Sequence, residues 1–328
     1  MEMNFNISHN RATINGQSIH YVEAGEGYPI IFLHGFPESW YSWRYQLEFL
    51  SERGFRVIAL DQRGYGGSSA PKDIDAYNIL HLVGDVIALM DLRSLEKAVV
   101  VGHDWGAPVA WSTALFRPDR IAGVVGLSVP YRPRGSFQPT VRMRELSGED
   151  FYQLYFQLEG RAEADFEGDL STSIFSMFYG NSADSFAVNG PWKMHSPADR
   201  GFFAEAPPLP KEPPKWLSEK DLAIYVEAFR GNGFRGPLNW YRNLDRNWEL
   251  TEPWSRARIT LPSMYLAGKV DPVVHFPGAD AMIAKMDGVL PGLFRAKLID
   301  DCGHWTQQEA PEIVNQSLLD FMNHIMAL

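Results

Sequence analysis

The chain has 328 residues, of which 45% are hydrophobic and 21% charged, so it holds enough apolar material for one large domain or for a domain carrying an insertion. Its formal net charge is −10, and it contains no run of consecutive Lys or Arg residues that would attract a phosphate backbone. The composition therefore argues against nucleic acid as a partner.

The sequence lacks the features of secreted and membrane proteins. Residues 1–10 do not show the basic stretch followed by an apolar stretch that marks a signal peptide. No apolar run approaches the roughly 18 residues needed to cross a bilayer. The single cysteine, Cys302, cannot form an internal disulfide, and a Cys-based metal site needs more ligands of that type. We expect a cytoplasmic protein with no bound metal and no membrane contact.

Short apolar runs rich in β-branched residues alternate with helical patterns, which is typical of a mostly parallel sheet covered by helices on both faces. The runs predict strands at residues 29–33, 55–60, 98–101, 124–128, 263–267 and 296–299. Helices are predicted at residues 74–91, 105–116 and 312–326. The fold class is therefore α/β.

The alternation stops after Pro130 and strand character returns near Ile259. The intervening residues are dense in aromatics, Met, Gly and Pro, and we interpret residues 131–254 as an inserted, mainly helical cap. The core domain then comprises residues 1–130 and 255–328. Within the cap, the proline-rich residues 206–214 cannot form a helix, and Ser218 with Asp221 has the spacing of a helix N-cap.

The most informative segment is a predicted strand, a Gly-x-Asp-x-Gly turn and a helix, over residues 98–116. A sharp turn of this kind lifts its central side chain out of the sheet and is known as a nucleophile elbow. The central side chain is Asp104, where serine hydrolases carry serine. The pattern also fits an ordinary loop in which Asp104 caps the helix.

A carboxylate at the elbow favours a particular chemistry. With a reference pKa near 3.9, Asp104 is ionised at neutral pH and needs no base to make it nucleophilic. Attack on a carboxylic ester gives a labile anhydride, whereas displacement at an sp³ carbon gives an alkyl ester that water can cleave. The absence of a Gly-x-Ser-x-Gly pattern also argues against a serine esterase.

The remaining catalytic groups follow in the order nucleophile, acid, histidine, each after an apolar strand. His304 is the expected general base, and Asp271 is the acid expected to orient it. Three other carboxylates compete with Asp271 for this role, and topology favours Asp271 over them: Glu38, Asp300 and Asp301. The amides of Trp105 and Phe36 are the expected oxyanion-hole donors, although the turn containing Phe36 also fits an ordinary loop.

The residues resemble the epoxide hydrolases of the α/β-hydrolase superfamily, and especially the C-terminal hydrolase domain of soluble epoxide hydrolases. The matching motifs are HGFPESW at residues 34–40, DQRGYGGS at 61–68, GHDWG at 102–106, FYQLYFQ at 151–157, FRGPLNWYR at 234–242 and DCGHWT at 301–306. The first three are shared with relatives such as haloalkane dehalogenases, whereas the two cap motifs are specific to the family.

The resemblance implies that two cap tyrosines donate hydrogen bonds to the epoxide oxygen. By motif position these are Tyr152 and Tyr241, with Tyr155 as a competing candidate for the first. Such phenols can stabilise or protonate the alkoxide formed when the ring opens. The residues expected to contact the substrate are Phe36, Trp105, Tyr152 and Tyr241.

We therefore predict an α/β-hydrolase fold and hydrolysis of a lipophilic epoxide to a vicinal diol through an alkyl ester of Asp104, with water as second substrate and no cofactor. The expected oligomeric state is monomer or homodimer. One alternative is a haloalkane dehalogenase, which would use the Trp105 indole to bind halide, although Phe36 stands where that class usually has Asn. The other is a non-catalytic ligand receptor with the same fold.

Overall fold

The computed structural model describes residues 6–197 and 199–328. Its centre is an eight-stranded sheet of order β1-β2-β4-β3-β5-β6-β7-β8. The strands are β1 Ser8–Ile14, β2 Gln17–Ala24, β3 Tyr28–Leu33, β4 Phe55–Leu60, β5 Ala98–His103, β6 Ile121–Leu127, β7 Ser263–Gly268 and β8 Leu293–Ile299. β2 pairs antiparallel with β1 and β4, and the other neighbours pair in parallel.

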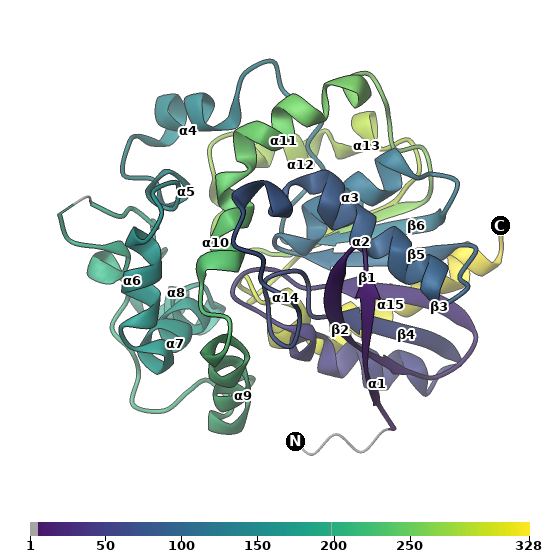
Figure 1. Cartoon of the computed structure of the whole chain (residues 1–328), viewed down its shortest axis with the longest axis horizontal. Helices are drawn as coiled ribbons and strands as arrows, with labels where there is room; N and C mark the ends of the chain where they lie inside the picture. The colour runs from purple at the N-terminus through teal and green to yellow at the C-terminus, as the bar shows by residue number, and fades with distance from the viewer. Residues whose placement is uncertain (1–5, 198) are drawn as a thin grey trace.

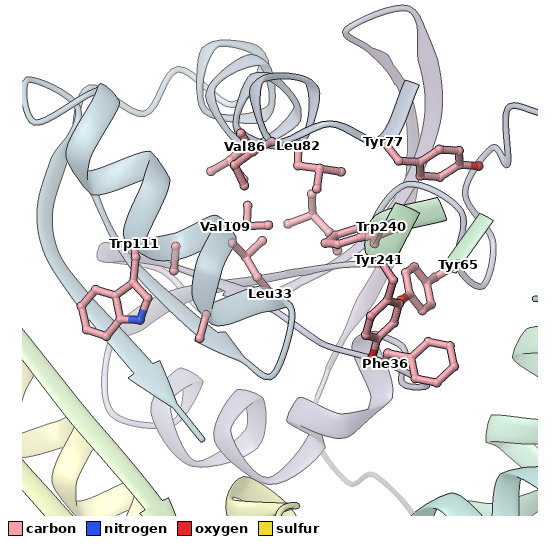
Figure 2. Packing of buried hydrophobic residues seen from close by; sticks show 14 of the residues in the cluster. Leu33, Phe36, Tyr65, Tyr77, Leu82, Val86, Val109, Trp111, Trp240 and Tyr241 are labelled. Carbon is pink, nitrogen blue, oxygen red and sulfur yellow. The ribbon is translucent and has the colours of Figure 1, made fainter. Parts of the chain in front are cut away.

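Two layers of helices cover the faces of the sheet (Figure 1). α2 (Ile79–Leu92) and α3 (Gly106–Phe116) bury apolar side chains on one face, and α1 (Arg44–Ser51) and α15 (Pro311–Met326) do so on the other. Figure 2 shows part of the first layer, where Leu82 and Val86 of α2 approach Val109 of α3 and Leu33 of β3. Each such aliphatic side chain contributes about 1.5–3 kcal/mol when fully buried.

All six predicted strands are present, with small shifts at their ends. The predictions for residues 105–116 and 312–326 correspond to α3 and α15. The prediction of one continuous helix over residues 74–91 was wrong. Asn78 has an extended backbone (ψ 159°) and separates the 3₁₀ helix η2 (Ile74–Tyr77) from α2. The Asn78 side chain accepts hydrogen bonds from the amides of Leu80 and His81, and so caps α2.

Between β6 and β7 the described residues form helices and loops, joined by one isolated β-bridge. The helices are α4 Pro139–Ser147, α5 Tyr152–Tyr155, α6 Arg161–Glu167, α7 Leu170–Gly180, α8 Ala183–Asn189, η3 Phe202–Glu205, α9 Glu219–Arg230, α10 Arg235–Arg242, α11 Leu244–Leu250 and η4 Glu252–Trp254. Residues 206–214 are not helical, as expected, and Ser218 and Asp221 form the predicted capping box of α9. In Figure 1, α6 to α9 gather beside the sheet.

Short helices complete the chain: η1 Trp40–Trp43, η5 Pro272–His275, α12 Ala279–Ala284, α13 Met286–Val289 and α14 Thr306–Glu309. Within residues 6–197 and 199–328, no helix combines the length and apolar character required to span a membrane. The expectation of no signal peptide rests partly on residues 1–5, which lie outside the described residues.

A buried ion pair joins the loop after β4 to α2 and α10. Asp85 of α2 accepts hydrogen bonds from Arg63 Nε at 2.9 Å and Nη2 at 2.6 Å, and from Asn15 Nδ2 at 3.1 Å. The Arg63 carbonyl accepts a hydrogen bond from the Trp240 indole at 3.1 Å. This pair therefore supports the segment of α10 that carries Tyr241.

Replacing Asp85 with Ala leaves the buried Arg63 guanidinium without its carboxylate. We expect the free energy of unfolding to fall by about 3–5 kcal/mol, because an uncompensated buried charge is costly. Urea denaturation measures the loss. Asp91→Ala on the same helix is the control, since Asp91 forms an exposed ion pair with Arg120 and should cost about 1 kcal/mol or less. Equal losses in the two variants would contradict the prediction.

Candidate active site

The predicted elbow is present at the end of β5. Asp104 has a left-handed backbone with φ of 48°, a conformation that non-glycine residues rarely adopt and that often marks a functional site. A Cβ atom on Gly102 would lie 2.0 Å from the Gly106 carbonyl oxygen, so only glycine allows the strand and helix to approach this closely. The turn directs the buried Asp104 carboxylate toward a cavity.

Both predicted amide donors reach Asp104. The Phe36 amide donates to Oδ1 at 2.8 Å, and the Trp105 amide also hydrogen-bonds this carboxyl group. Burial raises the pKa of Asp104, while the nearby His304 and the two amides oppose that shift. The Phe36 amide can therefore stabilise negative charge on Oδ1, and the Trp105 amide adds a second donor to the same carboxyl group.

His304 lies between the two predicted carboxylates. Its Nε2 is 3.6 Å from Asp104 Oδ2, and its Nδ1 is 3.0 Å from Asp271 Oδ1. Burial alone would lower the pKa of His304, but Asp271 and Asp104 outweigh burial and raise it to about 9. Burial would raise the pKa of Asp271, yet His304 outweighs it and lowers that pKa. In the unreacted site, His304 is therefore an imidazolium held by two carboxylates.

Sequence reasoning missed Ser128, whose Oγ lies 3.1 Å from His304 Nδ1 and which also hydrogen-bonds Asp271. Its position as the last residue of the predicted strand 124–128 was a usable signal, since parallel strands end at one edge of the sheet. The three carboxylates that competed with Asp271 do not contact the His304 side chain. Asp300 and Asp301 are exposed, and buried Glu38 contacts His103 at 2.7 Å.

Tyr152 of α5 and Tyr241 of α10 are both buried and both line the cavity. Their ring centroids are 6.0 Å apart, and Figure 2 shows the Tyr241 hydroxyl beside Phe36. Tyr152 Oη accepts a hydrogen bond from Gln153 Nε2 at 2.8 Å, and Tyr241 hydrogen-bonds the Trp105 side chain. Because both partners are donors, each hydroxyl keeps its own proton available to a ligand.

Tyr155 does not line the cavity, and its hydroxyl donates to Asp165 at 2.5 Å. Burial is the largest cause that raises the pKa of Tyr152 and Tyr241, and the Asp104 charge adds to it. Both phenols are therefore neutral donors at ordinary pH.

The cavity at Asp104 is small, and part of its space is open to solvent. It is lined by Phe36, Asp104, Tyr152, Met177, Asn181, Met194, Tyr241, Pro272, Val273, Phe276 and His304. Asp271 lies behind His304 and is fully buried. In the described part of the chain, no cluster of three or more His, Cys, Asp or Glu side chains is arranged to hold a metal ion. The cavity joins one carboxylate, one imidazole and two phenols to an otherwise largely apolar wall.

This fold and site define a hydrolase of the α/β class, and the chain matches the α/β-hydrolase fold family over residues 28–311. It is 44% identical over 313 residues to Epoxide hydrolase A of Mycobacterium tuberculosis, covering 94% of this chain and 95% of that protein. It is 40% identical over 322 residues to Epoxide hydrolase 3 of Siraitia grosvenorii, covering 97% and 98%.

Among solved structures, the chain resembles Epoxide Hydrolase A from Mycobacterium thermoresistibile with a TM-score of 0.89 and 45% identity, covering 97% of this chain and 98% of that one. The chain therefore belongs to the epoxide hydrolases of the α/β-hydrolase fold. The predicted fold class and family are confirmed.

The position of His304 between two carboxylates predicts its titration. By NMR, the imidazole should titrate with a pKa of about 9. Asp104→Asn removes one negative charge that favours the imidazolium, so the pKa should fall. Asp271→Asn should lower it further, because Asp271 is the larger of the two stabilising charges. An unchanged His304 titration in both variants would show that the imidazole lies outside this carboxylate pair.

Proposed function

We propose that the chain converts a lipophilic epoxide and water into a vicinal diol through a covalent alkyl ester of Asp104. The observation that carries this proposal is that Asp104, Tyr152 and Tyr241 line one cavity, in which the Asp104 charge acts on both phenols and His304 adjoins the carboxylate. The geometry supplies a nucleophile on one side of the reacting carbon and proton donors for the ring oxygen.

In the first half-reaction, Asp104 attacks an epoxide carbon and the carbon–oxygen bond of the ring breaks. Oδ2 is the better placed nucleophile, because Oδ1 is occupied by the Phe36 amide. The electrons of the broken bond go to the ring oxygen, which takes a proton from Tyr152 or Tyr241 while the other donates a hydrogen bond. Oδ1 stays with the amides and becomes the ester carbonyl oxygen.

In the second half-reaction, ester formation changes the state of His304. It removes the Asp104 charge, which is one cause of the raised His304 pKa, so that pKa falls. His304 then gives its proton to the tyrosinate left by ring opening, which restores the phenol and leaves the imidazole neutral. Neutral His304, oriented by Asp271, then takes a proton from water as the oxygen attacks the ester carbonyl carbon. The Phe36 and Trp105 amides stabilise the negative charge on the tetrahedral intermediate. Its collapse breaks the ester bond, and the departing alkoxide takes a proton from His304 to give the diol. The proton on the new Asp104 carboxyl group then passes to His304, which restores the carboxylate and the imidazolium.

The substrate class follows from the remaining wall of the cavity, which includes Met177, Met194, Val273 and Phe276. Apolar side chains of this kind favour a lipophilic epoxide. The proposed reaction uses no cofactor or metal. We also propose that residues 131–254 act as a cap on a core formed by residues 1–130 and 255–328, and that the protein is a cytoplasmic monomer or homodimer.

Two observations favour epoxide opening over halide displacement. The Trp105 indole, which a dehalogenase would use to bind halide, hydrogen-bonds Tyr241. The side chain at Phe36 is a phenyl ring and provides no second N–H donor. Dehalogenation leaves the two phenols of the cavity without a role.

The covalent route predicts a difference between two variants. Asp104→Ala should show no turnover, because the nucleophile is absent. His304→Gln should form the ester and accumulate it, since only the hydrolytic base is lost, and intact-protein mass spectrometry should detect the adduct. A companion test is single turnover in ¹⁸O-water with excess enzyme, where the heavy oxygen should enter Asp104 and not the first diol. Label in the first diol would mean direct attack by water.

The two cavity tyrosines should differ from their neighbour Tyr155. Tyr152→Phe and Tyr241→Phe should each slow ester formation by roughly 10²-fold, because each removes a donor to the ring oxygen. Tyr155→Phe is the control, since that hydroxyl binds Asp165 and not the cavity. Stopped-flow measurement of ester formation tests this, and a Tyr155→Phe defect matching that of Tyr152→Phe would contradict the assignment.

A further inference from the structure

The backbone of His304 is held on both sides. Its amide donates to the Asn181 carbonyl at 2.9 Å, and its carbonyl accepts from His103 Nε2 at 2.8 Å. Asn181 belongs to the segment between α7 and α8 and also lines the cavity. The proposed base therefore depends on a contact from outside the core domain for its position.

Glu309, at the end of α14, makes a second connection to the same segment. Its Oε1 accepts from the Trp305 amide at 2.9 Å, and its Oε2 accepts from the Gly303 amide at 2.9 Å. Oε2 also accepts from the amide of Ala183, the first residue of α8, at 2.8 Å. One carboxylate thus binds the residues on either side of His304 and joins them to the helical insertion.

The close packing of the backbones at Gly303 and at residues 181–183 independently supports this connection. A Cβ atom on Gly303 would lie 2.6 Å from the Ala183 amide nitrogen and 2.7 Å from the Asn181 carbonyl oxygen. Such distances are shorter than any ordinary contact, so residue 303 must be glycine for the segments to pack in this way. Residues 181–183 therefore lie directly against the loop that carries His304.

We infer that Glu309 is a positioning residue for the hydrolytic half-reaction, because it fastens residues 181–183 of the helical insertion to the amides that flank His304. This inference rests on the proposed function, in which His304 acts as a base only after the ester has formed. A carboxylate has enough lone pairs for three amide donors. Glutamine has the same size but a single acceptor oxygen, and its NH₂ group would face at least one amide donor.

The test is Glu309→Gln, mixed rapidly with styrene oxide as the probe. Ester formation should stay within about two-fold of the unmodified enzyme, whereas ester breakdown should slow by roughly 10–100-fold, because a base displaced by a fraction of an ångström still leaves the nucleophile in place. The ester should then accumulate during turnover. Glu309→Asp keeps the charge on a shorter side chain and should give an intermediate rate of breakdown.

Two control variants distinguish a specific effect on the position of His304 from a loss of stability or of a surface charge. Glu312→Gln removes an exposed carboxylate three residues further along, and should behave like the unmodified enzyme. Ile14→Ala lowers stability by removing buried carbons from the edge strand β1, away from His304, and should not accumulate ester. Slowing of both half-reactions by the same factor in Glu309→Gln, or of neither, would overturn the inference.

Hydrogen exchange supplies a readout that does not depend on activity. Exchange at the amides of Ala183, Gly303 and Trp305 should speed up in Glu309→Gln and not in Glu312→Gln. Unchanged exchange overturns the inference even if turnover falls. Absence of an ester in His304→Gln, by contrast, counts against the proposed function, and the exchange experiment still tests the connection made by Glu309.

Discussion

The site depends on keeping the Asp104 carboxylate charged in a place where water is scarce. Removing a carboxylate from water costs several kcal/mol unless charges and hydrogen-bond donors replace the solvent. Here the Phe36 amide and the His304 imidazolium replace it, at 2.8 and 3.6 Å. The left-handed backbone of Asp104 is unfavourable in conformational free energy, and the strand and helix approach closely at Gly102. The packing of the surrounding sheet and helices stabilises this arrangement.

In the reaction that we propose, the same ion pair allows one histidine to serve both steps. While Asp104 is charged, it helps to keep His304 protonated, and an imidazolium cannot act as a base. Once Asp104 is esterified, that charge is gone and the imidazole becomes basic at the moment when a base is needed. Asp271, whose pKa is lowered by His304, keeps its charge in both states. The charges of Asp104, His304 and Asp271 thus determine the order of the two proposed steps.

The parts predictable from sequence are those set by local pattern. Buried parallel strands appear as apolar runs, and parallel strands end at one edge, so Asp104, Asp271 and His304 could be assigned together. The hairpin of β1 and β2 was missed because its partly exposed, polar strands lack the continuous apolar runs that mark the buried strands. Tyr155 remained a competitor of Tyr152, because residues three apart share a helix face. In the structure, Tyr152 lines the cavity, whereas the Tyr155 hydroxyl binds Asp165.

The parts of the site that the sequence does not predict depend on contacts between distant segments. Nothing near Glu309 in the sequence indicates that its carboxylate meets Ala183, 126 residues away. The helical insertion supplies Tyr152 and Tyr241 to the cavity and the Asn181 carbonyl to the amide of His304. A shift of the insertion would therefore move the donors of the first half-reaction and the base of the second together. In the proposed reaction, the insertion therefore forms part of the catalytic framework, and its placement affects both chemical steps.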